Sequence, residues 1–97
     1  MYTATMIYPV KNESMEDFIR TWQETILKLA ITQPGYVRMQ LLTREAEAMA
    51  IGTWTEKTHA EAFMKLGPFK KLMEAVGEML TGEPRPTIWT QSAYASR

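Results

Sequence analysis

The chain has 97 residues, and its eleven basic and eleven acidic side chains cancel to a formal net charge of zero. This length is that of a single domain, 1–97, and the balanced charge argues against nucleic acid or an anionic membrane as a partner. Cysteine is absent, which excludes disulfides and thiol chemistry. We expect neither a signal peptide nor a membrane span, so the sequence indicates a cytoplasmic protein.

The N-terminal third predicts a strand followed by a long helix. Residues 2–10 alternate at period two, which is typical of a strand. Ser14 stands three residues before Asp17, a spacing that predicts a capped helix start. Apolar side chains then recur at helical spacing until about Thr32, and a Pro-Gly turn follows and ends the helix.

The rest of the chain predicts a hairpin, a broken helix and a final strand. Thr58 and Glu61 have the spacing of a second capping box, and the Gly67-Pro68 corner breaks the helical pattern that follows. The predicted elements are strands at 36–43 and 48–55 joined by a polar tip at 44–47, helices at 58–66 and 68–80, and a strand at 87–94.

This β-α-β-β-α-β order predicts an α+β, ferredoxin-like fold, in which a four-stranded antiparallel sheet carries its helices on one face. Met49 and Ile51 fall on the face that the helices leave bare, and a bare apolar face predicts a homodimer formed through it. Ala50, Gly52 and Trp54 fall on the helix side. Two small residues beside a large ring indicate that either a packed helix or a ligand approaches the sheet there.

The order of elements and the TW-x4-H-x3-F-x5-F pattern from Thr53 to Phe69 resemble the antibiotic biosynthesis monooxygenase family of dimeric α+β barrels. The strand that ends in Trp54 and the Phe69-Lys70 pair are similar to features of its members. The resemblance spans nearly the whole chain. It implies a dimer and, as an activity, the oxidation of quinols or polycyclic aromatics without a cofactor.

Haem-degrading relatives resemble the chain most closely between Trp54 and Met73, but three of their residues are replaced here. They carry an iron-ligating histidine where Met73 stands, a tryptophan where Phe63 stands and an asparagine near Met6. The resemblance therefore implies that haem is not broken down by this protein.

Two side chains are candidates for catalysis. His59, the only histidine, is predicted in the first turn of the short helix, where a neutral imidazole could take a proton from a phenol; alternatively it is a surface residue of a helix cap. Trp54 could stack on an aromatic substrate or simply plug the space between helix and sheet.

We expect an apolar pocket between the helices and the strand face of Gly52 and Trp54, with His59 at its mouth. Candidate substrate-binding residues, each of which can instead be a core residue, are Tyr8, Trp22, Gly52, Phe63, Leu66, Phe69 and Met73. Histidine and carboxylates lack metal-ligand spacing, and no phosphate loop or nucleophile elbow is present in the sequence.

Two functions remain open. In the first, the protein is a cofactor-independent monooxygenase that supplies a dry pocket, a base and oriented donors to an electron-rich aromatic or quinol-type molecule. In the second, it is a dimeric module of the same fold that binds or senses a small molecule without turnover. The lone histidine favours the second function, and a methionine-rich, aromatic-lined space favours the first.

Overall fold

The computed structural model describes residues 1–66 and 68–97, and the predicted corner at Gly67 lies outside them. Three short segments have other helical windings: η1 (Asn12–Ser14) and η3 (Gly77–Met79) are 3-10 helices, and η2 (Gln23–Leu27) is π-helical. The main elements are β1 (Tyr2–Pro9), α1 (Met15–Trp22), α2 (Lys28–Ala30), β2 (Tyr36–Arg44), β3 (Glu47–Trp54), α3 (Lys57–Met64), α4 (Pro68–Val76) and β4 (Arg85–Thr90).

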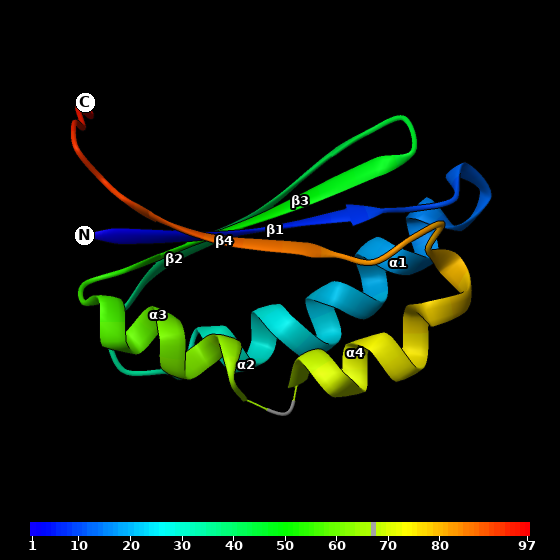
Figure 1. Cartoon of the computed structure of the whole chain (residues 1–97), viewed down its shortest axis with the longest axis horizontal. Helices are drawn as coiled ribbons and strands as arrows, with labels where there is room; N and C mark the ends of the chain where they lie inside the picture. Colours follow the sequence, from blue (N-terminus) through cyan, green and yellow to red (C-terminus); the bar gives the residue numbers. More distant parts are fainter. Residues whose placement is uncertain (67) are drawn as a thin grey trace.

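The four strands form one antiparallel sheet in the order β2-β3-β1-β4. The helices lie on one side of this sheet, as Figure 1 shows, so the predicted ferredoxin-like arrangement is confirmed. Gly52 is at its centre, because the register pairs it with Ala4 of β1 on one side and with Met39 of β2 on the other.

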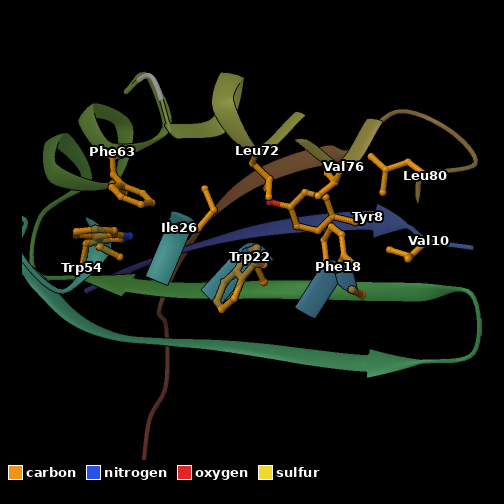
Figure 2. Close-up of a cluster of buried hydrophobic side chains, with 14 residues drawn as sticks. Tyr8, Val10, Phe18, Trp22, Ile26, Trp54, Phe63, Leu72, Val76 and Leu80 are labelled. Atoms are coloured by element: carbon orange, nitrogen blue, oxygen red, sulfur yellow. The ribbon is translucent and has the colours of Figure 1, made fainter. Parts of the chain in front are cut away.

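The core lies between the sheet and the helices and contains most of the aromatic side chains that alternate onto this face (Figure 2). Burying a large apolar side chain contributes about 1.5–3 kcal/mol to stability, so these residues dominate the energetics of the fold. The largest fully buried side chains are Trp22, Trp54, Tyr8, Phe18, Ile26, Leu72, Val10, Val76 and Thr53.

The sequence pattern predicts the first helix as one regular α-helix, but the helix changes winding at η2. Phe18, Trp22, Ile26 and Ala30 are all buried and follow one another at intervals of four residues. In a regular α-helix such a series drifts by about 40° per step around the axis. The wider π turn offsets this drift, so one face can contact the core from Phe18 to Ala30.

Neither predicted capping box forms. The Ser14 side chain makes no capping hydrogen bond at the start of α1. Helix α3 begins one residue earlier than predicted, at Lys57, so Glu56 rather than Thr58 occupies the cap position. The break between α3 and α4 is confirmed by their separate bounds.

The last strand is shorter than predicted, because the chain leaves the sheet after Thr90. The Gln91 amide donates a hydrogen bond to the Met1 carbonyl, 3.1 Å away. The guanidinium of Arg38, on β2 at the opposite edge of the sheet, lies 5.2 Å from the centre of the Tyr94 ring. Tyr94 therefore belongs to a tail that reaches the far edge of the sheet, and it is not part of β4.

The face of the sheet opposite the helices is partly apolar. Leu42 and Trp89 are 48% and 56% exposed, and Met49 and Ile51 are half-buried. The Trp89 indole N–H donates a 2.9 Å hydrogen bond to Thr5 Oγ1, which holds the large ring against this face. Within the described ranges, no helix has both the length and the apolar character needed to cross a bilayer.

Candidate functional site

A small cavity lies on the helix side of the sheet, next to Gly52. Its volume is about 30 Å³, which is enough for a water-sized group. Four of the predicted site residues line this cavity: Gly52, Trp54, Phe63 and Phe69. The cavity lies between the helices and the strand face of Gly52 and Trp54, where a pocket was expected. The complete lining is Ala4, Thr5, Met6, Ile26, Met39, Ala50, Gly52, Trp54, Phe63, Met64 and Phe69.

The cavity exists because the sheet surface is hollow at this point. Ala4, Ala50 and Gly52 are neighbours on β1 and β3 and together contribute only two methyl groups to the helix side. A Cβ atom added to Gly52 would lie 2.8 Å from Cε of Met39 and 3.2 Å from Nε1 of Trp54. The end of a flexible methionine and an indole N–H therefore occupy the space above this glycine.

Aromatic rings form the wall of the cavity. The Trp54 and Phe63 rings lie 5.0 Å apart, and the Phe63 and Phe69 rings lie 5.5 Å apart in an edge-to-face arrangement. On its other side, Trp54 meets the edge of Tyr36 at 6.0 Å. Trp54 is only 1% exposed, so it plugs the space between helix and sheet and also lines the cavity.

His59 is not among the residues that line the cavity. It is in the first turn of α3, as predicted, but its side chain packs against the backbone at Gly35, in the turn before β2. A Cβ atom on Gly35, whose φ is +78°, would lie 2.6 Å from Cγ of His59. Only glycine fits this turn both conformationally and sterically, and the expected place of His59 at the cavity mouth is not supported.

The remaining predicted residues lie outside the lining for different reasons. Leu66 follows the end of α3 and is 37% exposed. Met73 of α4 is half-buried and packs against the core. Tyr8 and Trp22 are fully buried beyond the cavity, in the part of the core nearer to Phe18.

The comparisons with known proteins agree on the architecture. The chain superimposes on a solved structure named "Putative antibiotic biosynthesis monooxygenase" from Nitrosomonas europaea with a TM-score of 0.80 at 16% identity, covering 96% of this chain and 100% of the other. It has the fold of the antibiotic biosynthesis monooxygenases.

Two further structures with this monooxygenase fold have informative names. One is a mutant form of SnoaB, a cofactor-independent oxygenase from Streptomyces nogalater (TM-score 0.78, 20% identity, 99% of this chain and 97% of the other). The other is the ActVA-Orf6 monooxygenase of Streptomyces coelicolor in complex with Nanaomycin D (TM-score 0.79, 15% identity, 99% and 91%). No protein-family model matches the chain.

A curated relative is more similar in sequence. It is the "Putative heme-binding protein" of Natronomonas pharaonis, which is 33% identical over 86 residues. The match covers 86% of this chain but only 14% of the relative, so the chain corresponds to a small part of that longer protein.

The sequence pattern did not predict which methionines line the cavity of this monooxygenase fold. Met6, Met39 and Met64 come from β1, β2 and α3 and all line the cavity. The high methionine count of eight was the available signal, but it did not show which thioethers meet. Flexible, polarizable side chains can change rotamer at low cost, which allows a small cavity to enlarge around an occupant.

Tyr8 and Trp22 have an unusual polar environment for a core. Burial raises the pKa of the Tyr8 hydroxyl above its usual range, and hydrogen bonding to the nearby Trp22 side chain opposes part of this rise. Even so, neither Tyr8 Oη nor Trp22 Nε1 has a hydrogen-bond partner of normal geometry among the described residues. The Tyr8 hydroxyl and the Trp22 indole N–H therefore interact with each other in the core, but not in the geometry of a normal hydrogen bond.

Proposed function

We propose that the protein belongs to the antibiotic biosynthesis monooxygenase family and binds an electron-rich aromatic or quinol-type molecule in the cavity beside Gly52. The observation that carries this proposal is the apolar lining with Trp54, Phe63 and Phe69 as its aromatic wall. The Streptomyces coelicolor neighbour, which holds Nanaomycin D, adds support. A cavity of about 30 Å³ is far smaller than usual ligand pockets, so the methionines must move when the ligand enters.

The proposed reaction needs dioxygen and no cofactor. A phenol with a hydrogen at the para carbon loses its hydroxyl hydrogen and that para hydrogen, and the para carbon gains one oxygen atom, giving a quinone. The other oxygen atom leaves with the two hydrogens as water, and the substrate provides the electrons. The protein would contribute a dry, apolar site and the Trp54 indole N–H above Gly52 as a donor.

His59 remains the proposed base, although it lies outside the cavity lining, so the phenolic hydroxyl of the ligand would have to extend beyond the cavity to the start of α3. If it takes the phenolic proton, both His59→Ala and His59→Gln should lower the oxidation rate by about 10²-fold or more and leave the affinity nearly unchanged. His59→Gln is the matched variant, because it preserves a side chain over Gly35 while removing the base. Oxygen uptake with 1-naphthol as substrate, and calorimetry for its affinity, measure the two quantities.

A binding module without turnover is the second candidate. It is favoured by the cavity lining, which contains no histidine, acid, lysine or tyrosine, and by the packing of His59 on Gly35. Saturable binding of 1-naphthol with no oxygen uptake by the wild-type protein would establish this function and exclude the first.

Haem is the ligand suggested by the name of the Natronomonas pharaonis relative, but the residues of this cavity do not fit it. No histidine, cysteine or tyrosine lines the cavity, and Met73, at the position of the iron ligand in haem-degrading relatives, packs in the core outside it. We therefore expect no haem breakdown. With haem and a reductant added, the Soret band should not decay through ordered verdohaem-like intermediates, and such a decay would contradict this prediction.

A homodimer is also proposed, formed through the sheet face opposite the helices. Its support is the apolar character of this face, with Ile51 at its centre and Leu42 and Trp89 exposed. Light scattering at micromolar concentration should give twice the chain mass of 11.2 kDa. Ile51→Lys should shift the protein to monomer, because it places a charge in the buried contact. If the wild-type protein is a monomer at this concentration, the proposed dimer is excluded.

The location of the protein in the cytoplasm also stays a prediction.

A further inference from the structure

We infer that the thioether sulfurs of Met6, Met39 and Met64 form a binding site for a soft monovalent metal ion, Cu(I), in the cavity beside Gly52. The inference goes beyond the proposed function and does not rest on it, because it needs only the three thioethers and no aromatic ligand. The observation that carries it is the convergence of three of the eight methionines, from β1, β2 and α3, on one cavity of about 30 Å³.

The register of the sheet brings two of these side chains together. Met6 on β1 and Met39 on β2 flank β3, because Met6 pairs with Ala50 and Met39 pairs with Gly52. Both methionines pack against the core on the helix side of the sheet. Neighbouring strands are only about 4.8 Å apart, and alanine and glycine leave the surface of β3 low between them. The two long side chains can therefore reach toward each other over β3.

The end of the Met39 side chain extends from β2 into the space above β3. Its Cε lies 2.8 Å from the position that a Cβ atom on Gly52 would take. Met64 lines the same cavity from the helix side. It follows Phe63 on α3, whose ring lies 5.0 Å from that of Trp54 on the sheet (Figure 2). Helix α3 is thus close enough to the sheet to bring a third thioether to the cavity.

The chemistry of the lining selects the metal. Thioethers are soft, uncharged ligands that favour Cu(I) over hard divalent ions. Among the described residues, those that line the cavity include no histidine, cysteine or carboxylate, so zinc and calcium lack their usual ligands there. A single positive charge is also the least costly one to bury among neutral groups, and the aromatic rings of the lining can stabilise a cation.

The cavity suits one ion in both size and access. Its volume is that of a water-sized group, so an ion can enter without displacing a side chain. Met6, Met39 and Met64 are each half-buried and not fully buried, which keeps the thioethers within reach of solvent. Because methionine is flexible, the three sulfurs can adjust their distances to a bound metal through small rotamer changes.

The test titrates the protein with Ag(I), a soft monovalent ion that is stable in air, by calorimetry in a chloride-free buffer. We expect the wild type to bind one Ag(I) per chain. Met39→Leu preserves the size of the side chain and removes the sulfur. It should weaken binding by about 10-fold or more, since even residues that only support a metal ligand are worth about 10- to 100-fold in metal affinity. Met6→Leu and Met64→Leu should have similar effects.

Two control variants should bind Ag(I) as the wild type does. Met49→Leu makes the same exchange on the opposite face of the sheet, and His59→Gln removes the only imidazole of the chain. The absence of cysteine means that no thiol competes for the ion. If either control weakens binding as much as Met39→Leu does, the ion binds elsewhere and the inference is wrong.

A second measurement uses Cu(I) itself under anaerobic conditions. The wild type should withdraw Cu(I) from its coloured complex with bicinchoninate, and Met39→Leu should withdraw clearly less. Failure of the wild type to bind Ag(I) in a one-to-one ratio, or equal affinities of the wild type and the three cavity variants, would overturn the inference. Neither result bears on the affinity for 1-naphthol, which tests the proposed function separately.

Discussion

Trp54→Ala is expected to lower the free energy of unfolding by about 3–5 kcal/mol, the usual cost of removing a large buried ring. The ring is 1% exposed and contacts Phe63 on one side and Tyr36 on the other. A chain of 97 residues has a total stability of about 5–15 kcal/mol, so this substitution removes a large fraction of it. Thermal unfolding should show a midpoint lower by roughly 15–30 °C.

Trp54→Phe is the matched variant for this experiment. It preserves an aromatic ring against Phe63 and should therefore cost clearly less than alanine. A cost below about 1 kcal/mol for Trp54→Ala would contradict the packing described above, because substitutions of this size are usual only away from the core.

Gly52→Val is expected to abolish most ligand binding at the cavity. The first added carbon already meets Met39 Cε at 2.8 Å, and the two methyl groups of valine extend further into a space of about 30 Å³. The affinity for 1-naphthol should fall by about 1–3 kcal/mol, the usual penalty for overpacking, which is roughly 5- to 150-fold. Isothermal titration calorimetry measures this change.

Two controls separate filling of the cavity from general damage. Gly77→Val makes the same exchange where an added Cβ meets no atom within 4 Å, and it should leave the affinity unchanged. Met39→Ala combined with Gly52→Val removes the side chain that valine meets first and should restore part of the binding. If Gly52→Val destabilises the fold and the affinity stays the same, the ligand binds elsewhere.

Much of the fold could be predicted from the sequence because its signals are local. Alternation at period two identified the strands of the sheet, and the Gly-Pro dipeptide in the sequence predicted that α3 and α4 are separate helices. The final strand was misplaced because alternation continues as far as Tyr94, while the chain leaves the sheet after Thr90. The capping boxes failed for a similar reason: Ser14 and Thr58 have the right spacing, but spacing does not determine where the first helical turn begins.

The site was predicted only in part because its residues meet across several elements. Gly52 and Trp54 share one strand face, a property that a sequence displays directly. Met39 reaches the cavity through the register of β2 on β3, which is shifted by an irregularity between Tyr36 and Arg38 and has no local signature. His59 was assigned to the cavity from its helical position, but the turn at Gly35 provides a closer packing partner.

The π winding of η2 also accommodates one residue more than a regular α-helix of the same extent would. Removing one residue, for example the exposed Glu24, would allow this stretch to become regular α-helix. The missing residue would turn the rest of the helix back by about 100°, and the change from π to α winding would turn it forward by nearly the same angle, so Ala30 would stay in the core. A single deletion in η2 should therefore be tolerated, whereas a single insertion there should turn Ala30 out of the core.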